Sequence, residues 1–278
     1  VVVMYRGKIV EQQPVQQLFD QPQHPYTRAL LACRPVLYPK GIRLPVVADF
    51  LQPGEGGPDQ GLQSVETPAG IDSTRASALM EVEDLQVWFL SRKNFLGKAA
   101  EYTRAVDGLS FSVMQGETIG VVGESGSGKT TLGRALLRLV PARSGKVIYK
   151  GQDLLRLPKK ELRNLRKEIQ VVFQDPFGSL NPRITIGNAI AEAMKVYKLG
   201  NSKRSRKEAV VALLEKVNLK ADHYDRYPHA FSGGQRQRIG IARALALDPG
   251  FIVFDESVSA LDVSVQAQVL NLINDLKA

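Results

Sequence analysis

The residues best suited to chemistry lie in one short stretch, 123–130, which reads GESGSGKT. The pattern G-x-x-x-x-G-K-[ST] is typical of loops that bind nucleotide phosphates when a strand precedes the loop and a helix follows it. Here the apolar run 118–122 comes before the loop and a helical run begins near Thr131. The glycines let the backbone approach phosphate oxygens without obstruction by a Cβ atom. The stretch therefore predicts a nucleotide site in preference to a plain glycine-rich turn.

Two side chains complete the predicted phosphate site. Lys129 can reach the β- and γ-phosphates, and the Thr130 hydroxyl can ligate Mg²⁺. Both lie where a helix begins, and the dipole of that helix favours bound anions. The residues expected to contact the phosphates of ATP are Gly123, Ser125, Gly126, Gly128, Lys129, Thr130 and Thr131.

Two carboxylates follow a second apolar run, Phe251 to Phe254. The run predicts a buried strand, and the carboxyl ends of such strands face the ligand in open α/β sheets. Asp255 is therefore the expected Mg²⁺ partner, directly or through water, and Glu256 is the expected general base for the attacking water. Without the loop at 123–130, a solvated strand end would be the favoured explanation of the two acids. With that loop in the chain, the catalytic interpretation is favoured.

A second candidate anion site is Ser232-Gly233-Gly234, which precedes a helical run beginning at Ile239. A serine N-cap and two glycines leave backbone N–H groups available at a helix N-terminus. The same residues also suit an ordinary helix cap, so this pattern alone leaves both interpretations open.

Composition sets the broad class. The chain has 278 residues, of which 44% are hydrophobic and 23% charged, and a net charge of +9. It contains no apolar run near the ~20 residues needed to span a bilayer, and a cytosolic protein is expected. Its basic residues gather in 156–167 and 203–207 without interleaved aromatics, which favours solvated helix faces over nucleic-acid binding. Cys33, the one cysteine, is expected to be a small buried residue.

Apolar periodicity and turn residues predict the order of the elements. A β-hairpin is expected over 1–10, helical runs at 26–33, 190–197, 207–217, 239–247 and 265–276, a basic helix at 158–167, and strands at 80–87, 105–113, 118–122, 146–149, 169–173 and 251–254. The stretch from Arg34 to about Ala78 is rich in Pro, Gly, Gln, Ser and Thr and is expected to be a flexible linker.

Five motifs occur in an order that resembles the nucleotide-binding domain of ATP-binding-cassette (ABC) proteins. They are GESGSGKT at 123–130, FQDP at 173–176, FSGGQ at 231–235, FIVFDE at 251–256 and SALD at 259–262. In that family they are the Walker A loop, Q-loop, signature, Walker B strand and D-loop. The flanking sequences at 174–183 and 227–238 look like those of the ATPase subunits of peptide, nickel and glutathione importers.

The resemblance implies an α/β fold. It would have a P-loop NTPase core with a mostly parallel sheet, an N-terminal antiparallel β subdomain and a helical subdomain inserted at about 176–232. The segments 3–11 and 22–31 are similar to the C-terminal end of such a cassette. Residues 1–37 are therefore expected to be the tail of a preceding cassette, 38–78 a flexible linker, and 79–278 a second cassette truncated after its D-loop helix.

The resemblance also implies roles for individual residues. ATP would lie between the Walker A loop of one cassette and the signature of another, so Ser232, Gly233, Gly234 and Gln235 would contact ATP held by the partner. Gln174 would sense the γ-phosphate and join Thr130 and Asp255 at Mg²⁺, and Ser259 and Asp262 would form the D-loop contacts. Phe89 is the first candidate to stack on adenine and Tyr102 the second, although either aromatic could belong to the core.

The function implied is that of an ATPase that powers import of peptides or similar small solutes. Its expected partners are a second cassette, membrane permease subunits and, indirectly, an extracytoplasmic solute-binding protein, with no nucleic acid. The expected location is cytoplasmic, on the inner face of the membrane. Low turnover is expected because the switch histidine and the next core strand of the family do not occur in the sequence. The alternative is a soluble ABC-type ATPase acting on nucleic acid or ribosomes.

Overall fold

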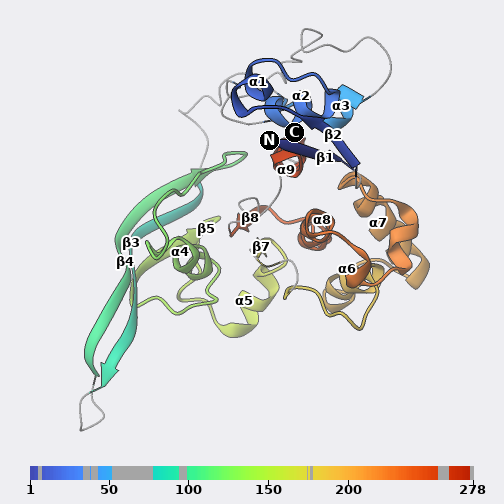
Figure 1. Cartoon of the computed structure of the whole chain (residues 1–278). Helices are drawn as coiled ribbons and strands as arrows, with labels where there is room; N and C mark the ends of the chain where they lie inside the picture. The colour runs from blue at the N-terminus through green and yellow to red at the C-terminus, as the bar shows by residue number, and fades with distance from the viewer. Residues whose placement is uncertain are drawn as a thin grey trace. The chain divides into compact units, whose positions relative to one another are not determined.

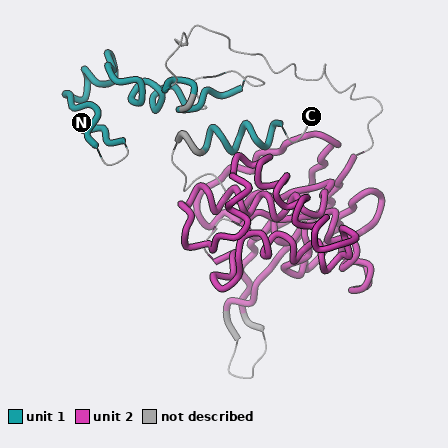
Figure 2. Tube along the Cα trace, turned by 90° about the vertical axis from the view of Figure 1, so that its right-hand side faces the viewer, with its two compact units in different colours: residues 1–71, 258–278 teal, residues 72–257 magenta. Residues whose placement is uncertain are grey.

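The structure is a computed structural model, and it describes residues 1–5, 8–33, 38, 43–51, 78–93, 99–173, 175, 178–255 and 263–275. The chain divides into two compact units, which Figure 2 colours separately. One consists of residues 72–257, and the other of residues 1–71 with 258–278. No helix in the described ranges is long and apolar enough to cross a membrane.

The larger unit contains an antiparallel sheet with strand order β4-β3-β5-β6 (Figure 1). Its strands are β3 (Ala78–Lys93), β4 (Ala99–Met114), β5 (Ser144–Tyr149) and β6 (Gln152–Asp153). Alternate residues at the start of β3 face the core, since Met80 and Val82 are buried while Glu81 and Glu83 are exposed. The register shifts after Val82, and the buried residues are then Leu85 and Val87. This period of two is the pattern of a sheet with one covered face.

A second sheet pairs β7 (Ile169–Val172) with β8 (Phe251–Phe254) in parallel. Backbone hydrogen bonds continue past the strand ends, from Phe251 N to the Glu168 carbonyl and from Asp255 N to the Val172 carbonyl, both 3.0 Å. Asp255 is thereby fixed at the carboxyl end of β8. Helix α4 (Lys129–Leu136) contributes Leu132 and Leu136 to the same apolar core as Ile169 and the β3–β4 hairpin.

Helices form the rest of the larger unit. They are α5 (Lys159–Leu165), α6 (Ile186–Val196), α7 (Lys203–Lys216), the 3₁₀ turns η2 (Ala221–Asp225) and η3 (Pro228–Ala230), and α8 (Gly233–Leu245). Thr185 and Ser202 cap α6 and α7 with their side-chain oxygens. Val210, Leu214 and Val217 form the buried stripe of α7, as the helical spacing of these residues predicts.

The smaller unit begins with an antiparallel hairpin of β1 (Val2–Tyr5) and β2 (Lys8–Gln12). The helices α1 (Val15–Asp20), α2 (Pro25–Ala32), α3 (Val47–Leu51) and α9 (Val263–Asp275) complete it. The Glu11 carboxylate accepts hydrogen bonds from the backbone N–H groups of Gln23 and His24 at 2.8 and 3.0 Å. These bonds hold the pKa of Glu11 below its ordinary value and place its charge at the start of α2, where a helix dipole favours an anion.

Most predicted elements are confirmed, with shifted ends, but two regions differ. No strand forms over 118–122, because none of the described strands pairs with residues 117–124 and an unpaired extended segment lacks the hydrogen bonds of a sheet. Within the range expected to be a linker, residues 47–51 form α3, and Leu44 is buried before it. The composition of 34–78 indicated loops, but it could not show that a distant helix would bind part of it.

Candidate nucleotide site

The loop at 123–130 leads directly into α4. Gly126 and Gly128 have φ angles of +83° and +97°, a left-handed conformation that favours glycine. A Cβ atom at Gly128 would lie 2.1 Å from the carbonyl oxygen of Ala105 on β4. Both backbone conformation and close approach therefore require glycine at 128. Gly128 is also the N-cap of α4 and supplies no side-chain cap, so the N–H groups of this first turn face the loop without a local side-chain acceptor.

Lys129 points back into the loop. Its Nζ atom donates to the carbonyl oxygens of Gly123 and Glu124 at 2.7 and 2.8 Å and lies 3.5 Å from Ser127 Oγ. The ammonium group is thus held beside the exposed loop residues that the sequence predicts to meet phosphates. Among those residues Gly123, Ser125 and Gly126 are exposed, and Thr131 is half-buried at the first turn of α4. The arrangement offers one fixed positive charge and a helix N-terminus to an anion.

Thr130 and Asp255 come together although they lie far apart in the sequence. The Thr130 hydroxyl donates to Asp255 Oδ1 at 2.7 Å, and Asp255 is only 9% exposed. Arg134 Nη2 lies 3.9 Å from Asp255 Oδ2. The sequence analysis did not identify Arg134 as a site residue. Its position four residues after Thr130, on the same face of α4, could have indicated it.

The donor set at this point suits Mg²⁺. A hydroxyl oxygen and a carboxylate oxygen lie side by side, and Mg²⁺ takes oxygen ligands, commonly one or two from protein with the rest from water and phosphate. No group of three or more His, Cys, Asp or Glu able to hold a metal occurs in the described part of the chain. The residues therefore fit a cation that arrives with phosphate oxygens of its own, and not a cage built entirely by protein.

The apolar segment before the loop is exposed. Ile119, Val121 and Val122 have 40%, 53% and 96% of their surface exposed. In the predicted strand these side chains would pack between helices, as in a sheet covered on both faces. The described residues supply no neighbouring strand for them, which explains both the exposure and the missing strand.

The signature residues lie at the start of α8, and their side chains are occupied locally. Ser232 Oγ accepts from Gln235 N at 3.4 Å, and Gln235 Oε1 accepts from Ser232 N at 3.0 Å, which is a complete capping box. Gly233 and Gly234 form the first turn. The structure thus realises the capping interpretation of this pattern, and an anion site would have to share these groups.

Another arginine ties α8 to the segment after the Q-loop motif. Arg243 Nη1 donates to the carbonyl oxygen of Ser179, and burial lowers the pKa of Arg243 from its ordinary value. A guanidinium group in a protein remains charged even so.

The two candidates for adenine stacking differ in their surroundings. Tyr102 belongs to a stack with Trp88 and Arg143, whose guanidinium carbon lies 5.2 Å from the Tyr102 ring centre and 4.3 Å from that of Trp88. Phe89 is 43% exposed and makes no ring contact with the described residues. Phe89 does not belong to the apolar core that contains Val87.

Four predicted site residues cannot be placed. Gln174, Glu256, Ser259 and Asp262 lie outside the described residues. The site as described therefore consists of the phosphate-binding loop, Thr130, Asp255 and Arg134, with the start of α8 described separately.

A glycine loop entering a helix, with an acidic residue ending a neighbouring parallel strand, defines a nucleotide-binding P-loop fold. A family model described as "ABC transporter" matches residues 106–259, and a model described as "Oligopeptide/dipeptide transporter, C-terminal region" matches residues 10–52. The chain therefore belongs to the ABC transporter family, which is characterised by nucleotide binding and ATP hydrolysis. The predicted family and fold class are confirmed, and the alternative of a nucleic-acid or ribosome ATPase is not favoured.

Relatives and solved structures agree with this assignment. The chain is 45% identical to the glutathione import ATP-binding protein GsiA of Escherichia coli (strain K12) and to that of Salmonella choleraesuis (strain SC-B67). Both comparisons cover 100% of this chain but 44% of the relative, so the chain spans less than half the length of these relatives.

Among solved structures, the ATP-binding cassette MJ0796 in a dimeric post-hydrolysis state with ADP and Pi is 26% identical, with a TM-score of 0.63. The match covers 71% of this chain and 82% of that one. The cassette cbiO1 of Clostridium perfringens shares the fold at 22% identity, with a TM-score of 0.59 and coverage of 72% and 74%.

Proposed function

We propose that the chain binds Mg-ATP and hydrolyses it as part of an ATPase that powers import of peptides or similar small solutes through a membrane permease. The observation that carries the ATPase assignment is the junction of Lys129, Thr130 and Asp255 at the N-terminus of α4. The 45% identical relatives are named glutathione import proteins, and this supports a small peptide as the transported class.

The phosphates would be held by the backbone N–H groups of the loop and by Lys129. The Lys129 ammonium would exchange its bonds to the Gly123 and Glu124 carbonyls for bonds to phosphate oxygens. Thr130 and Asp255 would hold Mg²⁺, with Gln174 as a third contact from the Q-loop. The metal would neutralise charge on the β- and γ-phosphates, which favours phosphoryl transfer to water.

Glu256 would act as the general base, because it follows the Mg²⁺ partner Asp255 at the end of β8. Arg134 would keep the Asp255 carboxylate oriented toward Thr130 through its 3.9 Å ion pair. For adenine, Phe89 is favoured over Tyr102, since the Tyr102 ring already contacts Trp88 and Arg143. An exposed aromatic ring that contacts no other ring among the described residues suits stacking on a base.

The signature residues Ser232 to Gln235 would contact ATP held by a second cassette, with Ser259 and Asp262 supplying the D-loop contacts. The dimeric MJ0796 structure, which is similar to this chain, supports a pair of cassettes. Because residues 10–52 match a C-terminal region, we assign 1–37 to the tail of a preceding cassette, 38–78 to the linker and 79–278 to the second cassette. Further partners would be permease subunits and a solute-binding protein, with the ATPase on the cytoplasmic face of the membrane.

The ATPase proposal is tested by Glu256→Gln. Loss of the general base should reduce steady-state phosphate release by roughly 10²–10⁴-fold and leave the affinity for ATP unchanged. The matched control is Glu208→Gln on α7, which removes an exposed carboxylate paired with Arg204 and should change neither quantity. Equal loss of binding and turnover in Glu256→Gln would show that Glu256 supports the structure instead of the reaction.

A further inference from the structure

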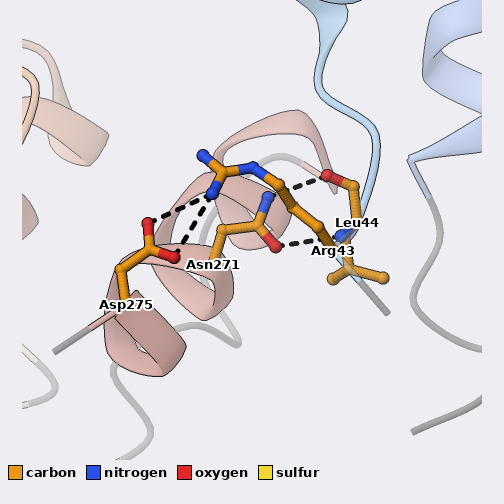
Figure 3. A network of polar contacts seen from close by, with 4 residues as sticks. All are labelled: Arg43, Leu44, Asn271 and Asp275. Atoms are coloured by element: carbon orange, nitrogen blue, oxygen red, sulfur yellow. Dashed lines mark hydrogen bonds and ion pairs between the residues drawn. The ribbon is translucent and has the colours of Figure 1, made fainter. Parts of the chain in front are cut away.

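Helix α9 holds the backbone of a distant segment through one amide side chain. Asn271 Nδ2 donates to the carbonyl oxygen of Leu44 at 2.8 Å, and Asn271 Oδ1 accepts from the N–H of Leu44 at 2.9 Å (Figure 3). Asn271 is 5% exposed and Leu44 9% exposed. A single side chain thus satisfies both backbone groups of one residue, as a neighbouring strand would, and does so away from water.

Apolar side chains surround this pair. Cys33, Leu44 and Ala267 form a buried cluster, and Leu270 packs against it from α9. At the edge of the cluster, Arg43 and Asp275 form an ion pair at 3.3 Å, with side chains 53% and 48% exposed (Figure 3). We call Cys33, Leu44, Ala267 and Asn271 the clasp. The buried pair of hydrogen bonds at its centre makes the contact specific, since exposed ion pairs contribute little to stability.

The two sides of the clasp come from different parts of the sequence. Cys33 and Leu44 lie within residues 10–52, the segment that matches the C-terminal region of oligopeptide/dipeptide transporters. Ala267 and Asn271 lie on α9, which begins at Val263 directly after the SALD motif of residues 259–262. The clasp therefore joins the segment that matches a transporter C-terminal region to the helix that follows the D-loop motif.

We propose that the face of α9 formed by Ala267, Leu270 and Asn271 is the docking surface for the tail of the preceding cassette, so that this tail and the helix after the D-loop fold as one piece. The assignment of the tail to a preceding cassette rests on the proposed function, whereas the docking itself rests on the contacts of the clasp. Because α9 starts where the D-loop motif ends, a tail anchored on α9 is connected to the segment that would contact the partner cassette.

Cys33 provides a built-in reporter of this docking. It is the one cysteine in the chain, it has no exposed surface, and burial together with the charge of Asp49 raises the pKa of its thiol to about 11. The thiolate form of cysteine is the nucleophile that attacks a thiol reagent, so buried Cys33 should react slowly while the clasp is closed. Trp88, the one tryptophan, lies on β3 in the larger unit and reports that unit independently.

The experiment is the rate of modification of Cys33 by a thiol reagent in the 278-residue chain and in Asn271→Leu. The leucine has a similar volume but cannot form hydrogen bonds with the Leu44 backbone. The clasp should therefore open more often, and the rate of Cys33 modification should rise roughly 10- to 100-fold. The urea midpoint of Trp88 fluorescence should not move. Ala267→Leu, which overfills the cluster, should also accelerate modification. The matched control Asp275→Asn removes only the exposed ion pair and should change the rate less than about threefold.

An unchanged rate in both Asn271→Leu and Ala267→Leu would overturn the docking. So would a rate in the unsubstituted chain that falls as protein concentration rises, because the tail would then be held by α9 of a second copy. Affinity for a fluorescent ATP analogue should be the same in Asn271→Leu and the unsubstituted chain. Absence of ATP binding in both proteins would refute the proposed function and leave the thiol result intact.

Discussion

Two helices of the larger unit, α4 and α8, start beside glycines, and their first turns are built in opposite ways. Helix α4 has Gly128 as its N-cap with no side-chain cap, and Lys129 bonds to loop carbonyls. Helix α8 has Ser232 as its N-cap, and the reciprocal bonds between Ser232 and Gln235 close its first turn. The N-terminus of α4 has no side-chain cap and has the Lys129 charge beside it, so it is open to an anion. At the N-terminus of α8, side chains of the same turn already bond to the backbone N–H groups. We infer that α4 binds phosphate alone and that α8 needs a partner cassette to present its nucleotide.

The contrast can be broken in the backbone by Gly128→Ala. An alanine would have to adopt φ +97° and place its Cβ 2.1 Å from the Ala105 carbonyl oxygen, so α4 or β4 must shift. The left-handed conformation alone costs about 1–2 kcal/mol, and the clash adds to it. We expect at least tenfold weaker binding of a fluorescent ATP analogue, together with a lower free energy of unfolding.

Two glycine variants serve as controls for Gly128→Ala. Gly126→Ala meets no atom within 4 Å but retains a φ of +83°, so it isolates the conformational cost. Gly240→Ala lies within α8, meets no atom within 4 Å, and should be neutral or stabilising by about 0.5–1 kcal/mol. If Gly128→Ala behaved like Gly240→Ala, the close approach of the loop to β4 would be wrong.

Asp255→Asn should have a smaller and more specific effect. The amide retains a hydrogen-bond acceptor for Thr130 but loses the charge that would face Mg²⁺ and Arg134. We expect Mg²⁺ to strengthen binding of the ATP analogue to the unsubstituted chain. In the variant this strengthening should be roughly tenfold smaller, because one charged ligand of the metal is lost. The measurement is analogue affinity with and without Mg²⁺. Asp225→Asn, which changes an exposed carboxylate of η2, is the control, and an equal response in both variants would remove Asp255 from the metal site.

The smallest expected effect comes from Ser232→Ala. Loss of an N-cap side chain costs about 1 kcal/mol. ATP affinity at Lys129 should stay the same, because Ser232 would contact ATP held by a second cassette. Ser202→Ala at the start of α7 is matched, since Ser202 Oγ accepts from Ser205 N at 3.0 Å. Urea unfolding compares the two. If Ser232→Ala instead weakened ATP binding, α8 would contact the same nucleotide as α4.

The sequence allowed the loop glycines, Lys129, Thr130 and Asp255 to be selected by residue type and spacing, because few residues meet the conformational and charge requirements of a phosphate loop. The structure brings Thr130 and Asp255 together, and their roles at a nucleotide stay predictions. The run 118–122 has the composition of a strand, but strand formation depends on a neighbour, and local pattern contains no information on pairing. Arg134 and the clasp depend on contacts between residues distant in sequence, Asp255 in one case and Asn271 in the other. A single sequence contains little information about such contacts.

The most direct test of the account is the affinity of the unsubstituted chain and of Lys129→Ala for a fluorescent ATP analogue in the presence of Mg²⁺. Lys129 is the one side-chain cation that bonds within the loop in the described structure, so its loss should weaken binding at least 100-fold. Lys207→Ala on α7, which removes an exposed ion pair with Asp225, should bind as the unsubstituted chain does. Equal affinity in Lys129→Ala and the unsubstituted chain would contradict the assignment of residues 123–130 as the nucleotide site.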